Sequence, residues 1–272
     1  QLVGPAEMKG ESLSVLDVLK PAALLSSLAA FKFWDASTWT PLEYLSWCSV
    51  ILIGLEILAW LVSNVPKLFS PIILPKRGSH LDVLTGKDIA FICWNKFTTT
   101  VFTYHALRFC WYSKTVKWGL DELTVLNTVV ALGGLFAVYD FFYHLFHRAL
   151  HLRSVYKYIH KHHHNQHAPS RGNSDAVNVH PFEFICGEYC HLLAIFLVPC
   201  HIVTAAVFVV GGGILASLNH TRFNLSVLSV FDVKYHDQHH VVPTVNYGQY
   251  IMLWDHLFGT YQEYPHEKLK GH

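Results

Sequence analysis

The chain has 272 residues, of which 52% are hydrophobic and only 14% are charged, and its mean hydropathy is +0.29. Soluble domains carry roughly a quarter of charged residues, so this composition favours an integral membrane protein. The formal net charge of +1 offers no basic surface for nucleic acid, and no nucleic-acid partner is expected. Of the six cysteines, Cys186 and Cys190 are four residues apart, but their apolar surroundings predict buried thiols rather than metal ligands.

The N-terminal part, residues 1–122, is expected to contain a lead-in segment followed by membrane helices. Residues 15–34 are apolar but are broken by Pro21, which favours an amphipathic or re-entrant segment. Residues 44–65 form an apolar run with one charged side chain, Glu56. This run is long enough to cross a hydrocarbon core of roughly 30 Å as a helix.

Three further apolar segments follow. Residues 89–112 predict a weaker span, because ionisable side chains interrupt it, and residues 123–146 predict a stronger one. Residues 184–219 are too long for one crossing, and Pro199 near their middle predicts a hairpin of two helices. The expected fold class is therefore an all-α integral membrane protein with about four to five transmembrane or re-entrant helices.

The hairpin determines on which side of the membrane the histidines lie. Eighteen of the twenty histidines follow Asp140, and the two crossings of the hairpin put residues 144–164 and 220–240 on one face. The lysine-rich loop 66–87 falls on the same face, which the positive-inside tendency predicts to be cytosolic. Residues 123–272 are thus expected to form one region, with helical histidine boxes as its cytosolic cap.

The histidines follow a repeated spacing. Three boxes stand out, one of the form HxxxH and two of the form HxxHH. They lie at His147 and His151, at His160, His163 and His164, and at His236, His239 and His240. On a helix, positions i, i+3 and i+4 share a face, so each box is expected to present its imidazoles to a single point. Eight imidazoles exceed the four ligands of a tetrahedral zinc and suit two metal ions. Nitrogen ligands are compatible with iron, zinc, copper or nickel, so the ligand type does not identify the metal.

Each ligating histidine needs a hydrogen-bond partner for its other ring nitrogen. Asp140, one turn before His144, is a candidate partner, as are Glu183 and Asp237, and His144 itself is close enough to reach the site. A competing interpretation is a metal transporter with a histidine-rich cytosolic loop. Such a loop needs no fixed spacing, so the ordered boxes favour a two-metal site.

Six segments in this order resemble the fatty acid hydroxylase/sterol desaturase superfamily, and the closest likeness is to sterol C5-desaturases. They are "YHLFHRALH", "IHKHHH", "NVHPFE", "LNHTRFN", "YHDQHH" and "NYGQYIMLWDHLFGTY", and the likeness covers about residues 125–262. The resemblance implies that the metal ligands are His147, His151, His160, His163, His164, His220, His236, His239 and His240. It implies that His180 is either a tenth ligand or a residue that supports one, and it implies no catalytic residue separate from the ligands.

The resemblance also implies an oxidoreductase, a membrane-bound non-haem di-iron desaturase or hydroxylase that uses O₂ on a lipid C–H bond, with a sterol favoured. It implies two iron ions (zinc can replace them in recombinant protein), electrons from cytochrome b5 and an NAD(P)H reductase, and location in the endoplasmic reticulum membrane. Residues 123–272 would be the catalytic region, and the boxes would be cytosolic. Squalene or another terpenoid, through epoxidation, and a fatty acyl chain remain alternative substrates.

The glycines at 211–213 lie in an apolar segment and predict close helix packing rather than a nucleotide site.

Overall fold

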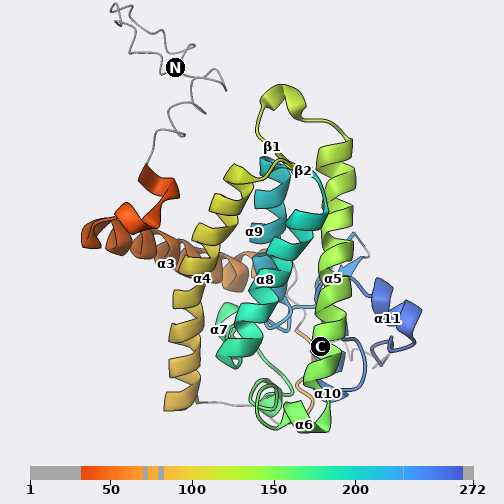
Figure 1. The fold of residues 1–272 in the computed structure, drawn as a ribbon. Helices are drawn as coiled ribbons and strands as arrows, with labels where there is room; N and C mark the ends of the chain where they lie inside the picture. The colour runs from red at the N-terminus through yellow and green to blue at the C-terminus, as the bar shows by residue number, and fades with distance from the viewer. Residues whose placement is uncertain (1–31, 70–72, 79–82, 229, 266–272) are drawn as a thin grey trace, which may run out of the picture.

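The computed structural model describes residues 32–69, 73–78, 83–228 and 230–265, so the predicted lead-in at 15–34 lies almost entirely outside the described residues (Figure 1). Helices make up most of the described chain. The long ones are α3 (Pro41–Asn64), α4 (Gly86–Tyr112), α5 (Ala131–Leu150), α8 (Pro181–Leu197) and α9 (Ile202–Leu218). The predicted all-α fold is therefore confirmed.

Shorter elements connect these helices. The short helices are η1 (Lys32–Trp34), η2 (Ala36–Thr38), η3 (Val65–Leu68), η4 (Leu120–Glu122), the π-helical turn η5 (Leu126–Val130), α6 (Arg153–Tyr156), η6 (His163–Asn165), α7 (Asn173–Ala176), α10 (Val233–Val241) and α11 (Leu253–Phe258). The strands are β1 (Val116–Lys117), which pairs in parallel with β2 (Cys200–His201), and β3 (Ser226–Val227), which pairs antiparallel with β4 (Phe231–Asp232). Each strand has two residues, so the sheets serve only to fix loops.

The ends of the long helices follow from their sequence. Thr40 and Glu43 form a capping box at the start of α3, and Thr85 and Asp88 form another at the start of α4. Such reciprocal bonds satisfy backbone N–H groups that have no partner within the helix. Helix α3 ends at Asn64, and the chain continues into the short helix η3, where Pro66 occupies the first turn, in which proline is tolerated.

The predicted hairpin of residues 184–219 is confirmed. Helices α8 and α9 have 17 residues each, and the break between them contains Pro199. The corner is fixed where β2 pairs with β1. The ring of His201 begins α9 by accepting the N–H of Val203 at 3.2 Å.

Helices α4, α5, α8 and α9 run side by side, and α3 crosses them, in contact with α4 and α9 (Figure 1). Within the part of the chain that the structure describes, two helices are long and apolar enough to cross a bilayer, Pro41–Leu68 and Leu126–Leu150. Only 6% of the apolar window in Pro41–Leu68 is buried inside the molecule, so most of its apolar surface is available to lipid.

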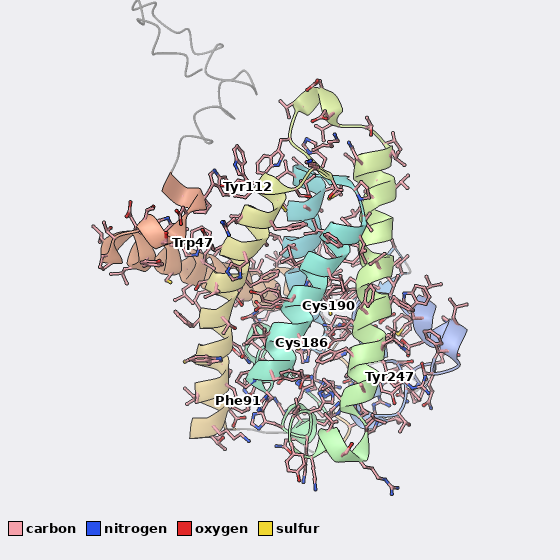
Figure 2. All side chains as sticks on the ribbon, in the orientation of Figure 1. Trp47, Phe91, Tyr112, Cys186, Cys190 and Tyr247 are labelled. Atoms are coloured by element: carbon pink, nitrogen blue, oxygen red, sulfur yellow. The ribbon has the colours of Figure 1, made fainter. Side chains whose placement is uncertain are left out.

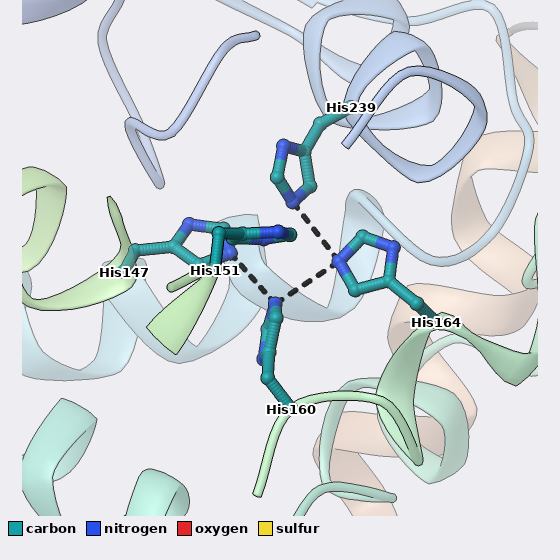
Figure 3. A group of neighbouring side chains, drawn as sticks. All are labelled: His147, His151, His160, His164 and His239. Carbon is teal, nitrogen blue, oxygen red and sulfur yellow. Dashed lines mark hydrogen bonds between the residues drawn. The ribbon is translucent and has the colours of Figure 1, made fainter. Parts of the chain in front are cut away.

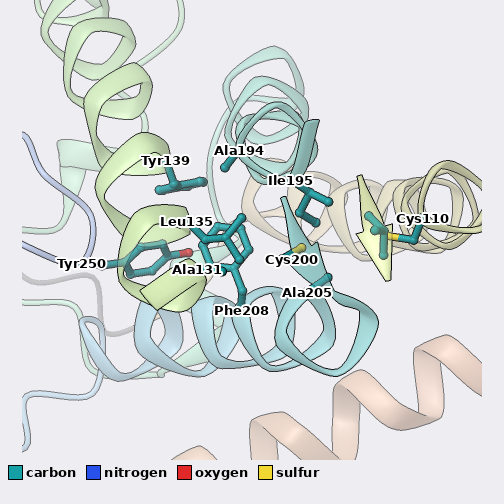
Figure 4. Close-up of a cluster of buried hydrophobic side chains, with 11 residues drawn as sticks. Cys110, Ala131, Leu135, Tyr139, Ala194, Ile195, Cys200, Ala205, Phe208 and Tyr250 are labelled. Carbon is teal, nitrogen blue, oxygen red and sulfur yellow. The ribbon is translucent and has the colours of Figure 1, made fainter. Parts of the chain in front are cut away.

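The main core lies between α5, α8 and α9 (Figure 4). Leu135, Ile195 and Phe208 are almost fully buried there, and Tyr250 packs in from the C-terminal segment. Cys186 and Cys190 lie along α8 (Figure 2) as free thiols, and both are half-buried rather than fully buried.

Candidate metal centre

Five histidines from separate segments meet near the C-terminal end of α5 (Figure 3). They are His147, His151, His160, His164 and His239, here called the five-histidine cluster. The successive Nε2 atoms of His147, His160, His164 and His239 lie 3.0, 3.0 and 3.1 Å apart. All five candidate ligand nitrogens lie within 4.8 Å of one another, a spacing at which they can hold one metal ion.

Four more histidines form a second group beside the first. They are His163, His220, His236 and His240, here called the four-histidine cluster. Their successive Nε2 atoms lie 3.4, 3.2 and 3.1 Å apart. The rings of His164 and His240 have centroids 4.9 Å apart, so the two clusters adjoin. Nine of the ten histidines expected as ligands are thus brought together.

The boxes do not each point to a single place, as the spacing predicted. His160 and His164 join the five-histidine cluster, whereas His163 joins the other one. Helix α10 divides in the same way, because His239 faces one cluster while its neighbours at positions 236 and 240 face the other. In α10 adjacent residues point about 100° apart, so His239 diverges from its neighbour at position 240. The earlier box is not on an α-helix as expected, because residues 160–162 form turns and His163 and His164 lie in η6.

His180 belongs to neither cluster. It immediately precedes α8, where its Nδ1 accepts the N–H of Phe182 at 3.2 Å. Its ring packs edge-on against Phe91, with centroids 5.7 Å apart. The structure therefore gives His180 the role of a helix cap, not that of a tenth ligand.

The Nδ1 atoms of three cluster histidines are held by oxygens that can only accept. His147 donates to the carbonyl of Tyr247 at 2.8 Å, and His239 donates to the carbonyl of Val245 at 2.6 Å. His160 donates to Oε1 of Glu183 at 2.7 Å. A neutral imidazole has one N–H, so the Nε2 atom of each ring is left with a lone pair.

These lone pairs converge inside the five-histidine cluster. The Nε2 atoms of His147 and His160 face each other at 3.0 Å with no hydrogen available between them. In addition, the Nε2 atom of His151 is buried without a hydrogen-bond partner. Facing lone pairs repel, and a bound cation converts that repulsion into ligation. The donor set therefore fits a metal ion.

The same holds for the four-histidine cluster. His220 donates from Nδ1 to the carbonyl of Ala216 at 2.8 Å, and His240 donates to the carbonyl of Gln166 at 2.9 Å. Their Nε2 atoms both face that of His236. Only one of these three rings has its Nδ1 without an oxygen acceptor, so at most one proton is available for two contacts.

Protonation does not offer another explanation for these contacts. Burial, followed by the neighbouring imidazoles, holds the pKa of His164 and of His239 well below the ordinary value. Burial and neighbouring imidazoles act on His236 and His240 in the same direction, so the pKa of each is also well below that value. Neutral imidazole is the form that binds metal ions.

Of the four residues expected to support the ligands, Glu183 does so directly. Its carboxylate accepts from His160, and its other oxygen, Oε2, is buried without a partner. Asp237 does not contact a histidine. It instead forms ion pairs with Arg222 at 2.5 Å and Arg77 at 3.1 Å, which fix α10 from its outer side.

Asp140 and His144 form hydrogen bonds to the segment that follows the last histidine box. The carboxylate of Asp140 accepts the backbone N–H groups of Gln249, Tyr250 and Ile251 rather than a histidine. The Nε2 atom of His144 lies 3.1 Å from Oγ1 of Thr260 and outside both clusters.

Asp255 completes this arrangement, in a role that the sequence did not identify. It accepts the backbone N–H groups of Tyr247 and Gly248 at 2.8 Å and lies 3.4 Å from His144. Because the carbonyl of Tyr247 binds His147, the two buried carboxylates at 140 and 255 fix the loop that orients a cluster histidine. Apart from α11, the segment that follows the last histidine box is a loop.

A cavity of about 280 Å³ opens above the four-histidine cluster. Its lining includes His163, His220 and His236 at one end. The rest of the lining comes from α3, α4, α5, α7, α8 and α9 and from the C-terminal segment. Most of its surface is apolar, with Leu55, Phe102 and Val209 among the residues, and polar side chains such as Glu188 and Gln249 interrupt it. A largely apolar cavity with placed polar groups is the usual form of a site for a small ligand.

An all-helical chain with two histidine clusters at the end of apolar helices is a candidate membrane metalloprotein, and comparison with known proteins narrows that class. Residues 132–260 match the family model described as fatty acid hydroxylase. This region contains every histidine of both clusters. The resemblance to the fatty acid hydroxylase/sterol desaturase superfamily is therefore confirmed.

Three curated relatives are similar over the same part of the chain. The Delta(7)-sterol 5(6)-desaturase of Eremothecium gossypii is 35% identical over 150 residues, which are 54% of this chain and 42% of that protein. The lathosterol oxidase of Homo sapiens is 30% identical over 149 residues, 53% of this chain and 48% of that protein. The fatty acid hydroxylase ahd1 of Mycosarcoma maydis is 36% identical over 122 residues, 44% of this chain and 30% of that protein. The chain thus spans less than half the length of each of these relatives, and no solved structure matches it significantly.

Proposed function

We propose that this chain is a membrane-bound di-iron oxidase that acts on a lipid C–H bond, with a sterol as the favoured substrate. The observation that supports this proposal most strongly is the pair of adjoining histidine clusters, one of which lines a largely apolar cavity with three of its histidines. The names of the relatives, sterol desaturases and a fatty acid hydroxylase, point to the same chemistry.

The five-histidine cluster would hold one iron and the four-histidine cluster the other. When bound, the iron pair would supply O₂ reduction, with two external electrons, and the oxidising power to remove hydrogen from an unactivated carbon. The chain itself would position the metal ligands. Carbonyls and Glu183 fix the tautomer and orientation of the ligands, since an Nδ1–H bonded to oxygen leaves Nε2 free for the metal.

The apolar walls of the cavity would exclude water and hold the substrate against the four-histidine cluster. A displacement of about 1 Å at the reacting carbon changes rates by roughly a hundredfold, so the walls would also select the carbon that reacts. Desaturation, hydroxylation and epoxidation differ in this placement. Squalene, another terpenoid or a fatty acyl chain are the alternative substrates within the same proposal.

We also propose that cytochrome b5 and an NAD(P)H reductase supply the electrons, and that the enzyme lies in the endoplasmic reticulum membrane with the clusters on the cytosolic side. The cationic loop before α4 and the basic residues around the clusters support this orientation. A metal transporter with a histidine-rich loop, the rival function, would need no fixed arrangement of its histidines, whereas the boxes here divide into two ordered clusters.

The test is lipid-dependent O₂ consumption by protein purified in mild detergent, loaded with Fe(II) under nitrogen and supplied with cytochrome b5, its reductase and NADH. A sterol is expected to stimulate O₂ uptake and to yield a product that has lost two hydrogens or gained one oxygen. The matched control is the His163→Ala/His239→Ala double variant, which removes one ligand from each cluster. Iron-loaded protein that consumes no O₂ with sterols, squalene or fatty acyl lipids would contradict the proposal.

A further inference from the structure

The cavity contains a carboxyl group, outside both histidine clusters, that no part of the proposed reaction uses. Glu188 lies near the middle of α8, and both it and Thr99 of α4 line the same cavity as the four-histidine cluster. A carboxyl group among apolar side chains is costly unless it has partners, so such a residue is a candidate functional group.

Only one of the two oxygens of this carboxyl group has a hydrogen-bond partner. Oγ1 of Thr99 donates to Oε1 of Glu188 at 2.6 Å. The other oxygen, Oε2, is buried and has no hydrogen-bond partner among the described residues. A buried acceptor without a partner destabilises the folded protein, and a ligand that brings a donor would relieve this cost.

The lysine side chain in the cavity lining already has an ion-pair partner. Lys96 lies one turn before Thr99 on α4, but its ammonium pairs with Oε1 of Glu56 on α3 at 2.5 Å. The carboxyl group of Glu188 therefore faces the cavity without this lysine as a partner, and a neutral hydrogen-bonding group such as a hydroxyl fits beside it.

The distance from the histidines is also informative. Glu183, which binds His160, lies five residues before Glu188 on the same helix, and five residues correspond to about 7.5 Å along the helix axis. One cavity thus joins a hydroxyl acceptor to the candidate metal site over a short distance, with apolar walls between them.

We infer that Glu188, positioned by Thr99, recognises a hydroxyl group of the lipid substrate and thereby determines which carbon meets the four-histidine cluster. This inference rests on the proposed function and deepens it, because it selects hydroxylated lipids such as sterols over squalene and fatty acyl chains, which lack the donor. A site that hydrogen-bonds a hydroxyl rejects analogues without it far more strongly than an apolar wall does.

The test measures binding, not turnover. The probes are dehydroergosterol, a fluorescent sterol with a free 3-hydroxyl, and its 3-methyl ether, which cannot donate a hydrogen bond. Affinity is measured by energy transfer from tryptophan in detergent-solubilised full-length protein treated with a chelator. The wild type is expected to bind the alcohol about tenfold or more tightly than the ether, the effect of one hydrogen bond to a carboxyl group.

Two variants and one control assign that preference to Glu188. Glu188→Leu is expected to bind both probes equally, with the affinity for the ether unchanged within about threefold. Glu188→Gln, which keeps a hydrogen-bonding group, retains part of the preference. Glu122→Gln removes a carboxyl group outside the cavity lining, one that pairs with Lys117, and retains all of it. Melting temperatures establish that each variant is folded.

Three results would overturn the inference: no preference in the wild type, an undiminished preference in Glu188→Leu, or no binding of either probe. These outcomes do not depend on metal or O₂. A Glu188-dependent preference in a protein that oxidises no lipid would leave the inference standing while the proposed function fails, and lipid oxidation without the preference would do the reverse.

Discussion

His160 bridges Glu183 and the five-histidine cluster, because its Nδ1 donates to Oε1 of Glu183 at 2.7 Å while its Nε2 lies 3.0 Å from the Nε2 atoms of His147 and His164. The carboxylate fixes the tautomer of a ring whose free nitrogen points into the cluster. This relationship links α8, which also lines the cavity, to the candidate metal site.

Replacing Glu183 tests that link. The variant Glu183→Gln keeps the shape of the side chain but removes its charge, so His160 becomes a less basic ligand held less firmly. Metal affinity is expected to fall about 10- to 100-fold, as measured by competition with a chromophoric chelator. Glu122→Gln, a carboxyl group in a distant loop, is the matched control and should leave affinity unchanged. Equal affinity in Glu183→Gln and wild type would contradict this role.

Asp140 is predicted to be a structural anchor. Its replacement by alanine leaves three backbone N–H groups, those of residues 249–251, without their acceptor. The expected loss of stability is on the order of 3 kcal/mol, measured by denaturant unfolding in detergent. The five-histidine cluster should also lose metal, because the carbonyl that holds His147 lies two residues before this segment. A stable variant with full metal content would refute the anchor.

Asp255 is predicted to make stability depend on acid pH. Burial disfavours its carboxylate, but hydrogen bonds from His144, Thr260 and the amides of Gly248 and Tyr247 outweigh burial and hold the pKa below the ordinary value of 3.8. The carboxylate therefore stabilises the fold at neutral pH, and this contribution is lost as the pH falls below 3.8 toward the folded-state pKa.

The comparison that isolates this group is wild type against Asp255→Asn, both treated with a chelator, from pH 7 to pH 3. The variant should be less stable by about 2 kcal/mol at pH 7, and the difference should shrink at the acid end. A difference that does not change with pH would show that the charge of Asp255 has no part in it.

The glycines at 211–213 provide a prediction with a built-in control. A Cβ atom at Gly212 would lie 2.7 Å from Nε2 of His191 and 2.8 Å from the hydroxyl of Tyr250, whereas one at Gly211 would meet nothing within 4 Å. Gly212→Ala should therefore break the 3.0 Å bond between His191 and Tyr250 and cost about 1–3 kcal/mol. Gly211→Ala should be neutral or slightly stabilising, because alanine favours helix. Thermal denaturation compares the stability of the two variants. Equal melting temperatures would contradict the close packing of Gly212 against His191 and Tyr250.

The sequence predicted the helices and the ligand types better than the assembly of the site. Apolar length and Pro199 were sufficient for the hairpin, because membrane-length runs and proline act locally. The spacing of the boxes identified the residues, but it did not reveal that His163 and His164 serve different clusters, since this depends on where the two chain segments meet. The Nδ1 acceptors at Tyr247, Val245 and Gln166 are backbone carbonyls, which every residue has and no sequence pattern distinguishes.

Asp140 was expected to bind a histidine because it lies one turn before His144 on α5. In the structure it faces the C-terminal segment instead, a long-range contact that helical spacing does not predict. Glu188 was not singled out for a similar reason. Its proposed role depends on its position in a cavity between several helices, and that cavity exists only in the folded protein.

The central claim, two separate metal sites built from divided histidine boxes, is tested most directly by metal stoichiometry. Elemental analysis of purified protein should give two metal ions per chain for wild type and for His256→Ala, an exposed histidine outside both clusters. His239→Ala and His236→Ala should each give one ion, although both residues belong to the same box, because they face different clusters. One ion in wild type, or the loss of both ions in either single variant, would contradict the account.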